Sequence, residues 1–81
     1  MTPALRLDCR GLYCPVPILR TAEGIGRLAD GEELELLADD PGVTGDLDAW
    51  CRGTGHELVS LSAAGGLITG LVRKRSRRRP S

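Results

Sequence analysis

The sequence is poor in aromatic residues: it contains no phenylalanine, one tryptophan (Trp50) and one tyrosine (Tyr13). A hydrophobic core must therefore be filled by leucine, valine, isoleucine and alanine. A chain of 81 residues forms one domain at most. A domain of this size buries only about 60% of the surface of its unfolded chain, so we expect modest stability.

Long apolar segments are also absent. No apolar run approaches the ~18 residues that are needed to span a bilayer, and residues 1–10 contain no apolar segment of signal-peptide length. The three cysteines, Cys9, Cys14 and Cys51, are odd in number, which does not suit the disulfide framework of a small secreted domain. These absences predict a soluble, cytoplasmic protein.

The formal net charge is zero, but the charges are unevenly distributed. Residues 1–72 carry five arginines and eleven acidic side chains, whereas residues 73–81 carry six basic side chains and no acidic one. We predict a globular domain over 1–72 and a basic, disordered tail over 73–81. The tail, which begins with Arg73 and Lys74, is interpreted as a solvated end. The alternative is an electrostatic tether for RNA, a membrane or an acidic partner.

Two segments, 4–9 and 32–38, alternate apolar and polar side chains, the pattern of half-buried strands. Their leucines are expected to face the core and their charged side chains to face water. One face of the sheet is then wet, so helices cover only the other face.

Between these strands, apolar residues recur every three or four positions from Ile18 to Ala29, which predicts an amphipathic helix that stops at Gly31. Gly24 and Gly26 each weaken this helix by roughly 1 kcal/mol, and their small size would let it pack close to the sheet. A second helix is expected over 43–53.

Two further strands, within 56–63 and 66–74, are joined by a turn around 63–66. The alternation over 58–61 is imperfect and leaves open which side chains face inward. The order is βαβαββ, with a right-handed crossover between the first two strands. We predict an α/β (α+β) two-layer sandwich, in which a four-stranded mixed sheet carries two helices on one face.

The segment "RGLYCPVPIL" places a cysteine at the start of the first helix. Because Pro15 and Pro17 both fit a first helical turn, Cys14 lies at or next to the N-cap. The helix dipole there favours the thiolate, and Arg10 adds positive charge from a loop that Gly11 allows to turn. The prolines remove two N–H donors, which opposes this effect and leaves the net pKa open. The sulfur is expected to be exposed, at the end of a parallel strand, where α/β folds place their chemistry.

The other candidate residues have simpler interpretations. Cys9 is expected in the first strand, with a resolving thiol for Cys14 as the alternative. Cys51 lies on the apolar face of the second helix and is expected in the core. A zinc site that combines the three cysteines with His56 lacks the paired short spacings of structural zinc. The carboxylates of Asp39 and Asp40 are expected to cap the second helix; the alternative is that they face a basic partner.

The segment "LDCRGLYCPVPIL" resembles the signature of the TusA-like, or SirA-like, sulfur-carrier proteins. The family pattern is Asp, any residue, Arg-Gly, two variable residues and then Cys-Pro-any-Pro. The residues that match it are Asp8, Arg10, Gly11, Cys14, Pro15 and Pro17. The likeness continues through "ADDPG" and "WCRGTGHEL" and covers residues 5–74.

The resemblance implies a sandwich like that of the C-terminal domain of translation initiation factor three, with no metal and no small-molecule cofactor. It also implies that Cys14 accepts sulfane sulfur as a persulfide from a cysteine desulfurase or a rhodanese and passes it to an acceptor protein. Family members serve tRNA thiolation, molybdenum-cofactor assembly or sulfur oxidation. Two other hypotheses are a redox or regulatory thiol module that pairs Cys9 with Cys14, and an RNA or protein adaptor that acts through the tail.

Overall fold

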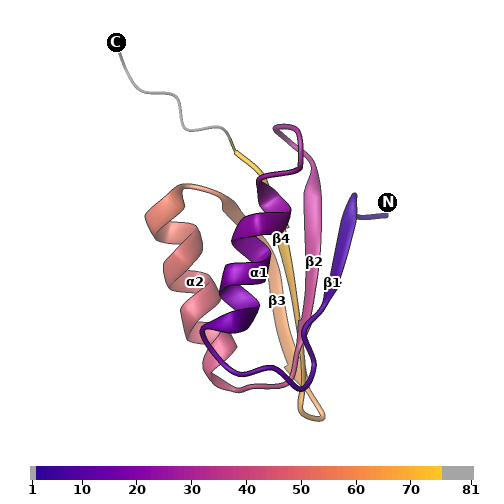
Figure 1. Cartoon of the computed structure of the whole chain (residues 1–81), viewed down its shortest axis with the longest axis vertical. Helices are drawn as coiled ribbons and strands as arrows, with labels where there is room; N and C mark the ends of the chain where they lie inside the picture. The colour runs from indigo at the N-terminus through magenta and orange to yellow at the C-terminus, as the bar shows by residue number, and fades with distance from the viewer. Residues whose placement is uncertain (1, 76–81) are drawn as a thin grey trace.

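A computed structural model describes residues 2–75 of the chain, which form a four-stranded sheet with both helices on one face (Figure 1). The strands lie in the order β1-β2-β4-β3; β1 is parallel to β2, and the other two pairs are antiparallel. The predicted fold class is therefore confirmed. The elements are β1 (Leu5–Asp8), α1 (Val16–Ile25), β2 (Glu33–Ala38), α2 (Gly42–Thr54), β3 (Glu57–Ala64) and β4 (Leu67–Arg73).

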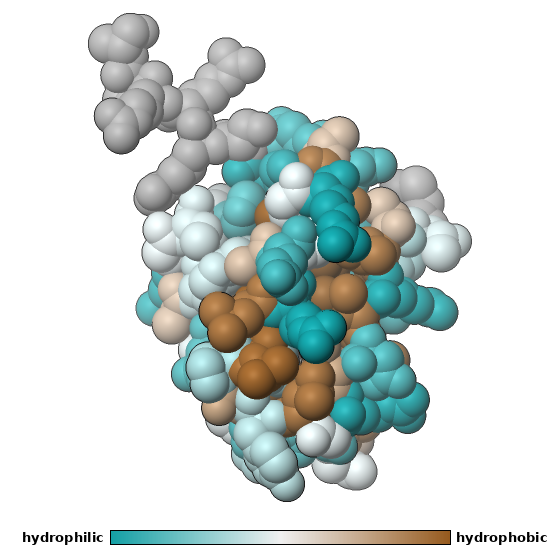
Figure 2. All heavy atoms as spheres, in the orientation of Figure 1, coloured by the Kyte–Doolittle hydropathy of each residue, from teal (hydrophilic) through white to brown (hydrophobic). Residues whose placement is uncertain are grey.

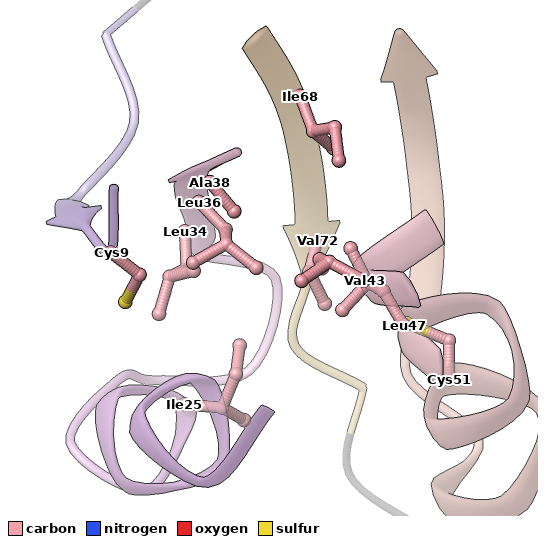
Figure 3. Close-up of a cluster of buried hydrophobic side chains, with 10 residues drawn as sticks. All are labelled: Cys9, Ile25, Leu34, Leu36, Ala38, Val43, Leu47, Cys51, Ile68 and Val72. Atoms are coloured by element: carbon pink, nitrogen blue, oxygen red, sulfur yellow. The ribbon is translucent and has the colours of Figure 1, made fainter. Parts of the chain in front are cut away.

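The hydrophobic core lies between the helices and the inner face of the sheet, and its centre is the alternation of β2. Leu34 and Leu36 are completely buried, as the sequence pattern predicts. Burial of a leucine side chain contributes about 1.5–3 kcal/mol to folding. Figure 3 shows Leu34 and Leu36 together with the core side chains of the helices and of β4. The core set is Cys9, Ile25, Leu34, Leu36, Ala38, Val43, Leu47, Cys51, Ile68 and Val72.

Helix α1 is shorter than the prediction: it ends at Ile25 with Gly26 as its C-cap. The N–H groups of Arg27 and Leu28 each donate to the carbonyl three residues earlier, so the chain tightens into a turn at this point. Two glycines within three residues give too little helix propensity to continue against that turn. The expected stop at Gly31 is therefore wrong as a helix end, although Gly31 has the positive φ of 90° that a turn glycine supplies.

Gly24 lets α1 pack closely against the sheet. A Cβ atom at this position would lie 2.7 Å from Leu34 Cδ1 and 3.0 Å from Leu5 Cδ2. At Gly26 a Cβ would contact only carbonyl oxygens of its own helix. The close approach that the sequence suggested for both glycines therefore belongs to Gly24 alone.

The imperfect alternation of β3 has a structural cause. The register against β4 shifts between Leu58 and Ser60, which is a β-bulge at Val59. Because the bulge adds one residue to this strand, Leu58 and Leu61 both pack against the core although they are three residues apart.

The C-terminal end of the described chain belongs to the sheet. Arg73 is the last residue of β4, and its guanidinium bridges Glu33 and Glu57 on the outer face at 2.7 and 3.2 Å. The N–H of Lys74 donates to the Glu32 carbonyl, and the Arg75 guanidinium pairs with Glu57. The first three residues of the predicted tail are thus bonded to the domain, and the rest of the tail (76–81) lies outside the described residues.

Candidate functional site

Three segments converge at the end of the molecule where the parallel strands β1 and β2 terminate. They are the loop from Cys9 to Pro15, the pair Asp39–Asp40 that follows β2, and the start of α2 (Figure 1). In open α/β sheets this edge is the usual position of a functional site, because loops from adjacent strands meet there. The sequence predicted this position for Cys14.

Cys14 immediately precedes the N-cap of α1, which is Pro15. The Cys14–Pro15 peptide bond is cis. Pro17 occupies the first helical turn and is buried. Neither proline has an N–H group, and the N–H of Val16 already donates to the Tyr13 carbonyl at 2.9 Å. The first residues of α1 therefore give the sulfur little hydrogen-bond donation, although they lie next to it.

The adjacent carboxylates Asp39 and Asp40 hold the cysteine loop in place. The N–H of Gly11, a residue with a φ of 82°, donates to both oxygens of Asp39 at 3.0 and 3.1 Å. The N–H of Cys14 donates to Asp40 Oδ2 at 2.9 Å, and the N–H of Gly42 donates to Oδ1 of the same carboxylate at 3.2 Å. The N-cap of α2 is Pro41, and no side chain caps it, so the predicted capping by Asp39 and Asp40 is wrong. Asp40 instead joins the first residue of α2 to Cys14, and Asp39 bonds to the loop.

The sulfur of Cys14 is partly buried and lies among carboxylates. A Cβ atom on Gly42, the first residue of α2, would be 3.8 Å from Sγ. The pKa of the Cys14 thiol is raised to about 11, first by a hydrogen bond to Asp46, then by burial and by the negative charges of Asp46 and Asp40. The expected exposure of the sulfur is therefore only partial, and the pKa of the thiol, which the sequence left open, is shifted upward because carboxylates and burial outweigh the helix dipole.

Arg10 does not supply the positive charge that the sequence suggested for the sulfur. Its guanidinium donates to both carboxylate oxygens of Asp8 at 2.8 and 2.7 Å. The hydrogen bonds from Arg10 lower the pKa of the Asp8 carboxyl to about 2. Two residues of the signature thus neutralise each other beside the loop, and Arg10 is not among the groups that shift the pKa of Cys14.

Asp46 is the site residue that sequence reasoning missed. Asp46 lies one helical turn after Gly42, so the two residues share a face of α2. This spacing is the only signal in the sequence that Asp46 could face a segment packed against the start of α2. The proximity to Cys14, which is 32 positions earlier in the chain, is created by the packing of α2 beside α1.

The other two cysteines lie in the core. Cys9 and Cys51 are 3% and 4% exposed, and burial raises the pKa of both thiols. All three cysteines are free. The rings of His56 and Trp50 are tilted by 34° with their centroids 5.3 Å apart, and His56 Nδ1 accepts the N–H of Arg75. Within residues 2–75, no three histidine, cysteine, aspartate or glutamate side chains group as metal ligands.

Arg73 and Lys74, the predicted partner-binding residues of the basic segment, lie at the opposite end of the sheet from Cys14. Arg73 pairs in register with Glu33, the first residue of β2. The cysteine loop instead contacts the residues that follow the last residue of β2. Lys74 Nζ donates to the Leu28 carbonyl at 2.6 Å. The structure thus separates these residues from the cysteine site.

A family model, that of sulfurtransferase TusA, matches residues 5–74 of the chain. The chain belongs to the TusA family. Among TusA relatives, the sulfur carrier protein TusA of Allochromatium vinosum is 40% identical over 68 residues, which cover 84% of this chain and 90% of that protein. A putative sulfur carrier protein of Neisseria meningitidis serogroup A is 44% identical over 66 residues, covering 82% and 89%.

A longer TusA relative, the putative sulfur carrier protein YrkF of Bacillus subtilis, is 42% identical over 74 residues; these cover 91% of this chain but 40% of YrkF. Among solved structures, the SirA-like protein of Desulfitobacterium hafniense matches with a TM-score of 0.77 at 22% identity, covering 89% and 99% of the two chains, and shares the fold. Neither helix in the described part of the chain is long and apolar enough to cross a bilayer.

Proposed function

We propose that this protein is a sulfur carrier that accepts sulfane sulfur as a persulfide on Cys14 and passes it to an acceptor protein. The observation that carries the proposal is the contrast among the three cysteines of a TusA-family chain. Cys9 and Cys51 are buried in the core, whereas Cys14 is partly exposed on a loop that two carboxylates fix to the domain.

The chemistry is that of thiol–disulfide exchange. Cys14 loses its proton and attacks the outer sulfur of a persulfide on the donor. The S–S bond of the donor breaks, a new S–S bond forms on Cys14, and the donor cysteine leaves as a thiolate that takes up a proton. In the second transfer an acceptor cysteine attacks the outer sulfur on Cys14 and releases the Cys14 thiol. No net oxidation occurs in either step.

The residues around Cys14 position the sulfur for this exchange. Asp40 fixes the backbone of Cys14 itself, and Asp39 fixes the loop through Gly11. The pair Asp8–Arg10 closes the start of the same loop. A fixed loop holds the sulfur where a partner can reach it without the cost of ordering the segment at each encounter.

An apolar surface beside Cys14 supports docking of a protein partner. Tyr13 and Leu19, which are 76% and 59% exposed, stand on either side of Cys14 in the sequence. Figure 2 shows hydrophobic side chains gathered on the helical face over the lower part of α1. Exposed apolar patches of this kind mark interaction sites. We assign this surface to the sulfur donor, a cysteine desulfurase or a rhodanese, and to the acceptor, and place the exchange in the cytoplasm.

The acceptor pathway is one of tRNA thiolation, molybdenum-cofactor assembly or sulfur oxidation. The three differ in the acceptor protein that would be co-purified with the persulfide form.

The test is incubation of the protein with a cysteine desulfurase and cysteine, followed by mass spectrometry under non-reducing conditions. We expect a gain of one sulfur atom, located by peptide mapping to Cys14 and removed by a reductant. The variant Cys14→Ser should gain none. Its folding is checked by circular dichroism, because Cys14 is only partly buried and serine should be tolerated. Equal sulfur uptake by Cys14→Ser and the parent would refute the proposal.

A further inference from the structure

Strand β1 forms one edge of the sheet, because it pairs with β2 and with no other strand of the described chain (Figure 1). The N–H and carbonyl groups on its open side therefore have no strand partner. The other edge strand, β3, carries the bulge at Val59, which disrupts regular pairing. β1 pairs in register with β2 throughout its length and is the more regular edge for an additional strand.

A groove separates the open edge of β1 from α1. Its cavity has a volume of about 120 Å³ and is lined by Leu5, Leu7, Arg20, Glu23, Gly24 and Arg27. The two leucines are half-buried, whereas the three charged side chains come from α1 and the turn after it and are exposed. A segment added to β1 would place every second side chain in this groove, because successive side chains of a strand point to opposite faces.

The groove contains the two arginines that lack an ion pair in residues 2–75. The other arginines of that range each pair with a carboxylate: Arg6, Arg10, Arg52, Arg73 and Arg75. Arg20 and Arg27 are exposed along the groove, and within the described chain Glu23 forms no ion pair with either one. Two arginines and one glutamate give the groove a net positive charge, with a cation toward each end, so it attracts negatively charged groups.

We propose that β1 accepts an extended acidic segment of a partner protein as a fifth strand, with carboxylates of that segment bound by Arg20 and Arg27. In strand addition, main-chain hydrogen bonds give affinity, and the pockets for alternate side chains give specificity. The proposal goes beyond the sulfur-carrier function, because it assigns a second binding surface that takes no part in the transfer. The cysteine loop begins directly after β1, so one end of the bound segment would lie beside that loop.

The spacing of the two arginines defines the segment that fits. Arg20 and Arg27 are seven residues apart, which is about 10 Å along a helix. Residues i and i+4 on one face of a strand are about 13 Å apart, and two long arginine side chains can span the difference. Residue i+2 then faces Glu23 and the leucines, which suits an apolar side chain and disfavours an acidic one. The geometry thus selects acidic residues at i and i+4 and an apolar residue at i+2.

Two other occupants fit the charge of the groove less well. A second copy of this chain that paired through its own β1 would bring the arginines of two grooves together, and like charges repel. Residues 76–81 contain three arginines and no acidic residue, so they carry the same sign of charge as the groove. Charge complementarity therefore favours an acidic segment of another protein.

The fluorescein-labelled peptide Ser-Glu-Thr-Val-Thr-Glu-Ser tests the proposal by fluorescence anisotropy at low ionic strength. It contains no cysteine, so its binding is independent of sulfur transfer. Arg20→Gln and Arg27→Gln should each weaken binding by about two- to fivefold, the range for an exposed ion pair. The matched control is Arg52→Gln, which removes the same charge from an exposed position on α2 and should leave the affinity unchanged. Circular dichroism checks that the variants fold.

Two methylated forms of the peptide separate strand addition from charge attraction. Methyl groups on alternate backbone nitrogens face β1 in one form and solvent in the other. Only the form with methyl groups toward β1 should lose binding, by at least about fivefold, because it loses its N–H donors. Hydrogen exchange measured by NMR should slow at the amides of β1 when the unmethylated peptide binds.

Equal binding of the two methylated peptides would show that charge alone holds the peptide and would overturn the inference. The same conclusion follows if Arg52→Gln weakens binding as much as Arg27→Gln, if no peptide binds at its highest soluble concentration, or if exchange slows in β3 instead of β1. Self-association of the protein that the peptide reverses would assign the edge to a second copy. The carrier function is refuted by a different result, sulfur uptake by Cys14→Ser, which peptide binding does not affect.

Discussion

The close packing of α1 on the sheet is tested by comparing two identical substitutions, Gly24→Ala and Gly45→Ala. Both glycines lie within helices, so each alanine gains about 1 kcal/mol of helix propensity. They differ in the space around the new methyl group. At Gly24 it would lie 2.7 Å from Leu34 Cδ1 and 3.0 Å from Leu5 Cδ2, whereas at Gly45 nothing lies within 4 Å.

The cost at Gly24 follows from burial. Leu34 is completely buried, so its methyl group has no solvent to move into and α1 must shift from the sheet. Overpacking of this kind costs about 1–3 kcal/mol. After the gain in propensity, Gly24→Ala should change the free energy of unfolding by between about zero and −2 kcal/mol, and Gly45→Ala should raise it by about 1 kcal/mol. The difference between the two variants, about 1–3 kcal/mol, isolates the packing cost.

Urea unfolding followed by the fluorescence of Trp50, the single tryptophan, measures both variants with one probe. Equal stabilisation by the two substitutions would refute the close approach of α1 to β1 and β2. Because Cys14 is fixed at the start of α1, a shifted helix should also slow sulfur acceptance in Gly24→Ala and leave it unchanged in Gly45→Ala.

Three further predictions concern the site and the charges. Asp40→Ala should accelerate hydrogen exchange of the Cys14 and Gly42 amides by roughly five- to tenfold, because both lose their acceptor; unchanged exchange, or the same change in Asp46→Asn, would contradict this role. The pKa of the Asp8 carboxyl, followed by NMR, should be near 2 instead of 3.8. Its contribution to stability is then complete above pH 3.8 and is lost as the pH falls toward 2. Arg10→Gln should restore the ordinary pKa, and a midpoint near 3.8 in the parent would rule out the Asp8–Arg10 pair. Arg75→Gln should change sulfur acceptance by less than about twofold, because Arg75 is separated from Cys14 by the length of β2, about 20 Å, which exceeds the screening length of about 8 Å. A larger loss would show that Arg75 binds the donor.

Local patterns in the sequence were sufficient for the fold class. The alternation in β2 set Leu34 and Leu36 inward because successive side chains of a strand point to opposite faces. The element order then left few topologies, since a parallel crossover is right-handed. The end of α1 and the bulge in β3 were not predictable in the same way. The apolar spacing continues past the two glycines where α1 ends, so it concealed the end of the helix. The bulge depends on how the chain packs, because it brings Leu58 and Leu61 to one core.

The features of the candidate site also fall into those that follow from the sequence and those that depend on tertiary packing. The sequence alone determined that Cys14 precedes a proline-marked helix, at the edge where the parallel strands end, because both follow from the order of residues along the chain. Only the tertiary structure decided the state of its thiol. Asp40 and Asp46 come from a distant segment, and their charges act on the sulfur through space once α2 packs beside α1. A pKa depends on distance and burial, which the order of residues does not contain.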